Sequence, residues 1–206
     1  MKNKLLIASG NKNKAKEIQS VGADFNLQFV LPGEINSQVP EIEENGSDFF
    51  SNALIKARAY HQWSSLPVLA DDSGLEVEIL GNLPGIYSAR YGGSISQLEK
   101  NEMLIREVLE SEKKLGKKNR KANFCCCLIL YFSENKYFHQ TERLWGEILD
   151  SPRGGGGFGY DPILKIDSLG KTLAEIDFNI TTSIGFRAIA LRKLLNGLDP
   201  TLWLVP

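Results

Sequence analysis

The amino-acid sequence predicts an α/β fold built on a mixed β-sheet. Apolar segments with the spacing of strands alternate along the chain with segments that carry the apolar stripe of amphipathic helices. Two strand-like segments are joined directly by a short polar turn. This hairpin breaks the strict alternation of strands and helices that a parallel sheet requires. The 206 residues include 24 Lys and Arg against 25 Asp and Glu, and 42% are hydrophobic, which is typical of an ordinary globular protein.

The first predicted elements are a strand, a polar loop and a helix. Residues 5–8 form a short apolar strand, residues 9–13 supply turn and capping side chains, and a helix begins near Lys14. A second helix begins at Ser47 or Asp48, either of which can cap free N–H groups. An apolar stripe from Phe50 to Tyr60 follows that start, as a helix packed on a sheet requires.

The middle and end of the chain continue the alternation. Residues 67–70 read as a strand that ends in a turn at residues 71–74, and residues 75–79 then alternate as a half-exposed strand does. The remaining predictions are a helix over 97–110, a solvated lysine-rich stretch over 113–121, a hairpin of 124–132 with 136–145, and a last helix over 183–195 that stops near Gly197.

Composition excludes several classes of protein. A formal net charge of -1 excludes a nucleic-acid binder that relies on overall basicity. No apolar stretch approaches the ~20 residues of a membrane span, and the start of the chain is too short for the core of a signal peptide, so we expect a cytoplasmic protein. The cysteines at 125, 126 and 127 are adjacent in an apolar run, which indicates a buried strand in a reducing compartment and not a metal site.

The loop between the first strand and the first helix is a candidate anion site. Unpaired N–H groups and the positive end of a helix attract phosphate there. The loop lacks the spacing of a P-loop and of a dinucleotide-binding turn, so a plain capped turn is an equal alternative. Its residues are Ser9, Gly10, Asn11, Lys12, Asn13 and Lys14.

Two adjacent carboxylates, Asp71 and Asp72, follow an apolar strand. They repel each other and need a cation nearby, and ligands bind beyond the carboxyl ends of strands in open α/β sheets. Mg²⁺ is the expected cation because it takes carboxylate oxygens together with substrate phosphates. The alternative is an exposed acidic turn. Glu43 and Glu44 can add a carboxylate, although acidic pairs before a helix also suit its dipole.

A glycine run at 154–157 leads into Phe158, Gly159, Tyr160 and Asp161. Glycine permits close backbone approach to a ligand, the aromatic rings offer a face to a base, and the carboxylate can accept hydrogen bonds. A flexible surface loop is the alternative reading. Arg187, on the predicted last helix, is either solvated or a contact for phosphate or a purine. The two histidines lack a partner at ligand spacing, and no serine-hydrolase elbow is present.

Taken together, these segments resemble the inosine triphosphatase family, the pyrophosphatases that remove non-canonical purine nucleoside triphosphates, and in particular its bacterial branch. The resemblance covers essentially the whole chain. The matching segments are residues 8–11 with Lys14, 43–44, 52–53 with 56–57, 70–75, 84–91, 157–162, and 170–172 with 174–175.

The resemblance implies hydrolysis of ITP, dITP and XTP to the monophosphate and pyrophosphate by a Mg²⁺-dependent homodimer. It implies an elongated mixed sheet flanked by helices, two lobes around a central nucleotide-binding cleft, and one domain over residues 1–206. Asp72 would be general base and Mg²⁺ ligand, with Glu44 as metal partner, Glu43 beside it, and Lys14 and Lys56 on the phosphates. The substrate-lining residues it implies are Ser9 to Lys14, Ser73, Phe158 to Asp161 and Arg187.

One region departs from the family pattern. Bacterial members carry a Lys and then Ser-His-Arg, whereas here Thr181 takes the Lys position and Phe186 the His position, and only Arg187 is kept. A site that discriminates through hydrogen bonds loses selectivity when one of its polar groups is lost. We therefore hypothesise an active pyrophosphatase with relaxed or shifted base preference. The alternatives are action on another modified base, a nucleotide-binding protein without turnover, and a nucleic-acid-binding module based on the lysine-rich stretch.

Overall fold

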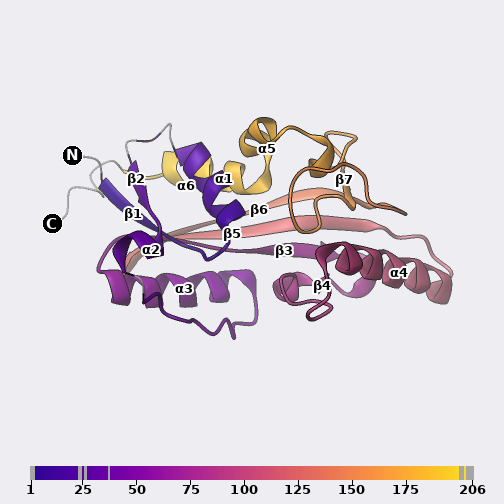
Figure 1. The fold of residues 1–206 in the computed structure, drawn as a ribbon, viewed down its shortest axis with the longest axis horizontal. Helices are drawn as coiled ribbons and strands as arrows, with labels where there is room; N and C mark the ends of the chain where they lie inside the picture. The colour runs from indigo at the N-terminus through magenta and orange to yellow at the C-terminus, as the bar shows by residue number, and fades with distance from the viewer. Residues whose placement is uncertain (1–2, 23–24, 26, 37, 200–201, 203–206) are drawn as a thin grey trace. The chain divides into compact units, whose positions relative to one another are not determined.

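The computed structural model describes residues 3–22, 25, 27–36, 38–199 and 202. Its centre is a mixed sheet of seven strands in the order β2-β1-β3-β5-β6-β7, with β4 paired to β3 (Figure 1). β1 is parallel to β2 and β3, whereas β3–β4 and β6–β7 are antiparallel, which confirms the predicted mixed α/β class. The strands are β1 (Asn3–Ala8), β2 (Leu27–Val30), β3 (Val68–Val77), β4 (Leu83–Pro84), β5 (Lys121–Ser133), β6 (Lys136–Ile148) and β7 (Leu164–Ile166).

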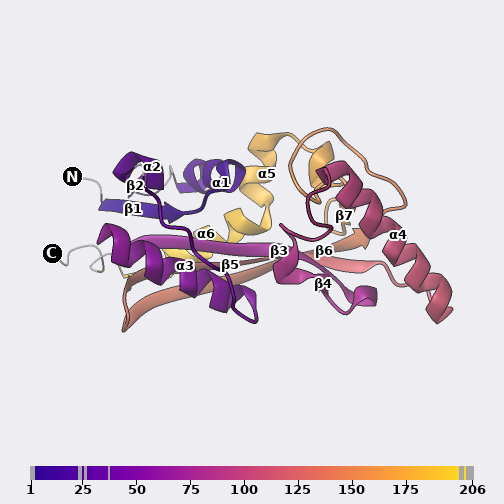
Figure 2. The same ribbon diagram turned by 60° about the horizontal axis from the view of Figure 1, so that its bottom comes forward.

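Helices cover both faces of this sheet. α1 and α6 lie on one side of β1 and β3, and α3 lies on the other (Figures 1 and 2). Figure 2 also shows α4 beside β4. None of the described helices is long and apolar enough to cross a membrane. The helices are α1 (Lys12–Gly22), α2 (Pro32–Ile35), α3 (Phe49–Ser64), α4 (Gln97–Leu115), α5 (Phe178–Ile184) and α6 (Phe186–Asn196), with short 3-10 helices at Glu78–Leu80, Gly85–Tyr87 and Leu173–Glu175.

The chain divides into two compact units. The first contains the described residues of Met1–Asp72, Cys126–Glu142 and Arg187–Pro206, and the second contains Ser73–Cys125 and Arg143–Phe186. Strands β3, β5 and β6 contribute residues to both units. The single domain over residues 1–206 stays a prediction.

The apolar core follows the predicted strands. The side chains of Leu5, Leu6 and Ile7 in β1 are fully buried, as are those of Val68 and Leu69 in β3. All three cysteines are free and fully buried in β5, so the predicted buried strand is confirmed. Burying apolar side chains such as these stabilises the fold by roughly 25 cal/mol for each Å² of apolar surface removed from water.

The predicted turn at residues 71–74 is wrong, because β3 runs through it without a break to Val77. Asp71 and Asp72 are 2% and 6% exposed, so the alternative of an exposed acidic turn is also wrong. Cationic partners, described below, allow these carboxylates to stay inside the sheet. Glycine is required at position 74, because a Cβ there would lie 2.4 Å from the carbonyl oxygen of Gly85.

Two predicted helices have different limits. α4 continues to Leu115 and ends at Gly116, which adopts a left-handed conformation with φ of 62°. The lysine-rich stretch therefore begins inside the last turn of this helix, where basic side chains interact favourably with the negative end of the helix dipole. The predicted last helix is interrupted at Gly185, where a Cβ would lie 2.6 Å from the carbonyl oxygen of Thr181, so α5 and α6 are separate.

Candidate active site

The candidate site begins where β1 ends beside β3. Ala8, the last residue of β1, pairs with Ala70 in parallel register, so the 9–14 loop and the two aspartates emerge at the same edge. Neighbouring residues in a strand point to opposite faces of the sheet. Asp71 accordingly meets α1 and α6 on one face, and Asp72 meets α3 on the other. The two carboxylates thus belong to separate groups.

The Asp71 group is a buried ion network. Lys14 Nζ lies 2.6 Å from Oδ1 of Asp71, and Arg187 Nε lies 2.7 Å from Oδ2. Arg187 also pairs with Glu17 of α1, and the Cys126 thiol donates to Oδ2 of Asp71 at 3.2 Å. Two helices and a neighbouring strand therefore hold one carboxylate.

The charges in this network keep Asp71 ionised. Burial alone would raise the pKa of Asp71, but Arg187 and Lys14 outweigh it and hold that pKa well below its usual range. Burial would lower the pKa of Arg187, and Asp71 and Glu17 reverse that effect, so the net pKa is raised. Burial beside Asp71 raises the pKa of the Cys126 thiol, which stays protonated at neutral pH.

The Asp72 group comprises Asp72, Lys56 and Glu44. Lys56, on α3, places its Nζ 3.0 Å from Oε2 of Glu44 and 3.5 Å from Oδ1 of Asp72. Burial tends to lower the pKa of Lys56, but the two carboxylates outweigh it and the net pKa is raised. The lysine is therefore a fixed positive charge between two carboxylates.

Asp72 differs from its neighbour in both pKa and hydrogen bonding. Burial raises the pKa of Asp72 to about 6 against the opposing charges of Lys56 and Lys14. Its Oδ2 is buried and has no hydrogen-bond partner among the described residues. A buried carboxylate oxygen without a donor is unusual and is available to a cation or a water molecule.

This raised pKa predicts how stability depends on pH. An aspartate with a higher pKa in the folded protein than in the unfolded chain favours folding while protonated, so its contribution is full below about pH 4 and declines as pH rises through about 6. We expect Asp72→Asn to be more stable than the wild type at pH 7.5, by up to about 3 kcal/mol, and equally stable near pH 4. Urea unfolding in a chelator measures this, and a pH-independent difference would contradict it.

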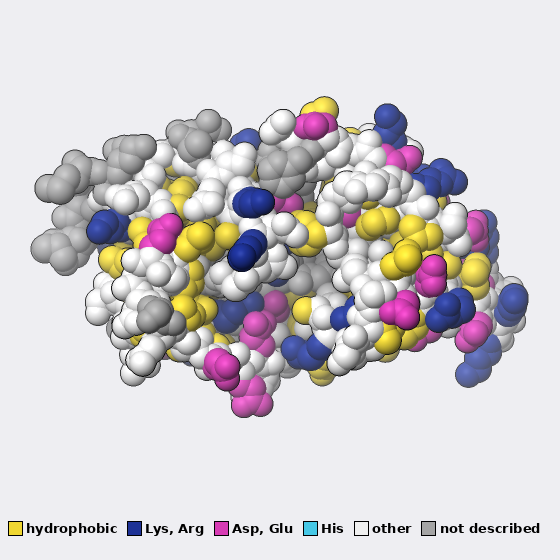
Figure 3. Space-filling model, in the orientation of Figure 1, with side chains coloured by type: hydrophobic (Ala, Val, Ile, Leu, Met, Phe, Trp, Pro, Cys, Tyr) yellow, Lys and Arg dark blue, Asp and Glu magenta, His cyan; other side chains and the backbone are white. Residues whose placement is uncertain are grey.

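The 9–14 loop is a capped turn. The side chain of Asn11 accepts hydrogen bonds from the backbone N–H groups of Asn13 and Lys14 at 2.9 and 3.3 Å, which satisfies donors at the start of α1. Gly10, Asn11, Lys12 and Asn13 are exposed, and Ser9 is half-buried. On the face shown in Figure 3, basic side chains gather over α1, and acidic side chains gather over the segment that precedes α3, which contains Glu43 and Glu44.

The glycine-rich segment is held within the second unit. Tyr160 is buried, and its hydroxyl donates to the carbonyl of Ser88 at 3.2 Å. The Asp161 carboxylate accepts from the backbone N–H of Phe158 at 2.8 Å, and Asn101 of α4 donates to the carbonyl of Gly159 at 3.2 Å. Residues 158–161 are therefore anchored, whereas Gly154 to Gly157 are exposed.

The positions that depart from the family pattern have different surroundings. Phe186 is 9% exposed, and its ring stacks on that of Phe124 with centroids 5.3 Å apart. Thr181 is half-buried on α5, and Ser73 is half-buried within β3. The substrate contacts expected for these residues and for Arg187 stay predictions.

Sequence reasoning did not identify Glu17 and Cys126 as members of the candidate site. Glu17 lies three residues after Lys14, so both share one face of α1, and this spacing is a usable signal. No comparable signal pointed to Cys126, because its contact with Asp71 depends on the pairing of β3 with β5.

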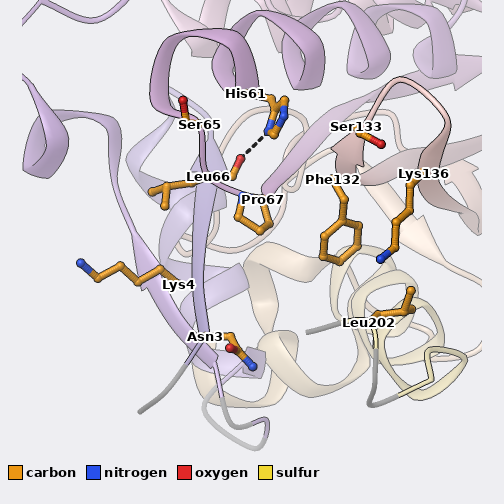
Figure 4. Close-up of a pocket in the computed structure, with 10 residues that line it drawn as sticks. All are labelled: Asn3, Lys4, His61, Ser65, Leu66, Pro67, Phe132, Ser133, Lys136 and Leu202. Carbon is orange, nitrogen blue, oxygen red and sulfur yellow. Dashed lines mark hydrogen bonds between the residues drawn. The ribbon is translucent and has the colours of Figure 1, made fainter. Parts of the chain in front are cut away.

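A separate pocket lies at the other end of β1 and β3. It encloses about 480 Å³ and is lined by residues that include Asn3, His61, Pro67, Phe132 and Lys136 (Figure 4). His61 Nδ1 lies 2.7 Å from the carbonyl oxygen of Leu66, as the dashed line in Figure 4 marks. None of the candidate site residues lines this pocket.

The fold and site define an α/β protein in which two adjacent buried carboxylates of β3 lie close to lysines near the end of the parallel strand β1. The chain belongs to the Ham1 family, whose family model matches residues 5–197. This confirms the family predicted from the sequence motifs.

The sequences of known relatives align with nearly the whole chain. A dITP/XTP pyrophosphatase of Treponema denticola is 43% identical over 91% of this chain and 94% of its own length. One from Escherichia coli K12 is 40% identical over 95% of this chain and 98% of its own length. A solved Ham1 protein structure from Coxiella burnetii has a TM-score of 0.81 and 38% identity, covering 93% of this chain and 95% of that one.

Proposed function

We propose that this protein is a nucleoside triphosphate pyrophosphatase that hydrolyses non-canonical purine nucleotides such as ITP, dITP and XTP to the monophosphate and pyrophosphate. The observation that carries the proposal is the Asp72 group, in which a buried carboxylate lies beside a lysine and a second carboxylate. One oxygen of this carboxylate has no hydrogen-bond partner among the described residues. The relatives named dITP/XTP pyrophosphatase support the reaction and the substrate class.

The residues of the Asp72 group fit a divalent cation. Mg²⁺ is usually held by one or two carboxylates together with phosphate oxygens and water. Asp72 offers its unpartnered Oδ2, and Glu44 is its partner, with Glu43 exposed nearby. No cluster of three metal-ligating side chains occurs among the residues that the structure describes, so the phosphates must complete the site. When bound, Mg²⁺ would neutralise charge on the phosphate chain.

Asp72 is the proposed general base. A base works best when its pKa lies near the working pH, and burial raises the pKa of Asp72 to about 6. Its carboxylate takes a proton from water as the water oxygen bonds to the α phosphorus. The bond from the α phosphorus to the bridging oxygen breaks, and that oxygen leaves as part of pyrophosphate. Lys56 and Lys14 then stabilise the negative charge of the departing pyrophosphate.

The remaining substrate contacts are assigned by residue type. The exposed residues Gly10 to Asn13, with Ser9, are proposed to contact the phosphates. Ser73, the 158–161 segment, Thr181, Phe186 and Arg187 are proposed to contact the nucleoside. Loss of the family's Lys and His at two of these positions supports a weaker preference for the 6-keto purines.

A substrate panel tests this function. We expect Mg²⁺-dependent pyrophosphate release from ITP, dITP and XTP, with a preference over ATP and GTP roughly tenfold smaller than that of the E. coli relative, the value of about one hydrogen bond. Pyrophosphate is measured directly, with both enzymes assayed side by side. Equal preferences would contradict the shifted specificity, and tight nucleotide binding without pyrophosphate release would favour a binding protein instead.

The assembly of the protein is proposed from the family resemblance, and its location from its cysteines. The family resemblance supports a homodimer, which sedimentation of the purified protein measures. Free, buried thiols in β5 support a reducing compartment such as the cytoplasm.

A further inference from the structure

We propose that Asn52 is a positioning residue that fixes the carboxylate of Glu44 for cation binding by the Asp72 group. The proposal rests on the proposed function and adds a residue to which no role in the site was assigned. Asn52 is fully buried on α3, one helical turn before Lys56.

Glu44 lies in a segment that has no helix or strand of its own. Residues 41–46 precede α3, and the N–H of Gly46, at the end of this segment, donates to Oδ1 of Asn52 on the helix at 2.8 Å. A Cβ on Gly46 would lie 2.7 Å from that same oxygen. Only glycine therefore lets the backbone approach Asn52 this closely.

Two contacts then hold the segment to one face of α3. Residues four apart in a helix share a face, so Asn52 and Lys56 both meet the segment. Lys56 binds the Glu44 side chain at 3.0 Å, and Asn52 binds the backbone two residues further on. Glu44 is thus held by its own side chain and by the backbone of Gly46, two residues further on.

The two contacts respond differently to a cation. A divalent cation held by the carboxylates of Glu44 and Asp72 would repel the ammonium of Lys56. The hydrogen bond between Gly46 and Asn52 is neutral and involves no cation ligand. It is therefore the contact that keeps Glu44 near Asp72 when the cation is bound.

The burial of Asn52 has a cost that an apolar residue would avoid. Its Nδ2 is buried and has no hydrogen-bond partner among the described residues. An unsatisfied buried amide destabilises a protein, and an apolar side chain on this helix would not. The benefit that offsets this cost is the hydrogen bond that Oδ1 of Asn52 accepts from the N–H of Gly46.

The test compares Asn52→Ala with Gly46→Ala. The probes are Mn²⁺ binding to the nucleotide-free protein, followed by electron paramagnetic resonance, and the Mg²⁺ concentration that half-saturates pyrophosphate release. Each variant is expected to weaken both by about 10-fold to 100-fold, as loss of outer-shell partners does, while kcat at saturating Mg²⁺ is largely kept. Hydrogen exchange at the Gly46 amide should also accelerate in Asn52→Ala.

Controls separate positioning from general damage. Ser64→Ala removes side-chain hydrogen bonds at the far end of the same helix and should leave cation affinity unchanged. Gly46→Ala would also place its Cβ 2.7 Å from Cβ of Ser51 and 2.9 Å from the backbone nitrogen of Asn52, so Asn52→Ala is the more selective of the two variants. Wild-type cation affinity in both single variants of an active enzyme overturns the positioning role alone. A wild type that neither binds Mn²⁺ nor releases pyrophosphate overturns the proposed function as well.

Discussion

Asp72→Asn is expected to lower kcat for pyrophosphate release by about 10²-fold to 10⁴-fold, the usual contribution of a general base. The amide keeps the shape of the side chain but cannot take a proton from water, and it is a poorer ligand for Mg²⁺. Oδ1 of Asp72 lies 3.5 Å from Nζ of Lys56, and its Oδ2 has no hydrogen-bond partner in the part of the chain that the structure describes. Pyrophosphate release at saturating Mg²⁺ and ITP measures the effect.

The control for this variant is Glu43→Gln, which changes an exposed carboxylate in the segment before α3. It should retain most of the activity, since Glu43 is only adjacent to the proposed metal partner. Circular dichroism should show that Asp72→Asn is folded, because this substitution is expected to raise stability at neutral pH. An active Asp72→Asn enzyme would remove Asp72 from the role of base.

Asp71→Asn is expected to destabilise the protein by about 3 to 5 kcal/mol at neutral pH. The substitution removes the charge that compensates Arg187, whose side chain is 3% exposed, and that also binds Lys14. A buried guanidinium then keeps its desolvation penalty but loses one of the carboxylates that offset it, while Glu17 remains. Urea unfolding measures the loss. Because the pKa of Asp71 is lowered in the folded protein, the difference in unfolding free energy between the wild type and Asp71→Asn should disappear progressively as pH falls below about 4.

The matched comparison is Arg58→Ala, which breaks the Arg58–Glu134 ion pair on the surface. Water already solvates both partners of that pair, so little stability should be lost. If Asp71→Asn and Arg58→Ala had similar small effects, the buried network would not be a source of stability.

Much of the fold could be predicted from local sequence patterns. Apolar runs identified β1 and β5, and the capping residue Asp48 marked the start of α3 within one residue. The path of β3 through Asp71 and Asp72 could not be predicted, because two adjacent carboxylates favour a turn until their partners are known. Those partners, on α1, α3 and α6, come from distant parts of the chain.

The site shows the same limit. Motifs singled out Lys14, Lys56 and Asp72, but spacing alone did not reveal that the two aspartates face opposite sides of the sheet. Strand alternation implies that separation only once β3 is known to be continuous. The short strands β2 and β7 were missed because four and three residues carry too little periodicity.

The chain passes between its two units at four places, after Asp72, Cys125, Glu142 and Phe186. Neither unit is therefore a continuous piece of the gene, and a chain that ends after Asp72, Cys125 or Glu142 leaves both units incomplete. The residues of the Asp71 group extend from Lys14 to Arg187, so the shortest fragment that contains them is most of the chain. Contacts between such distant segments form late and slowly, which makes this enzyme a poor candidate for fragment expression or split reporters.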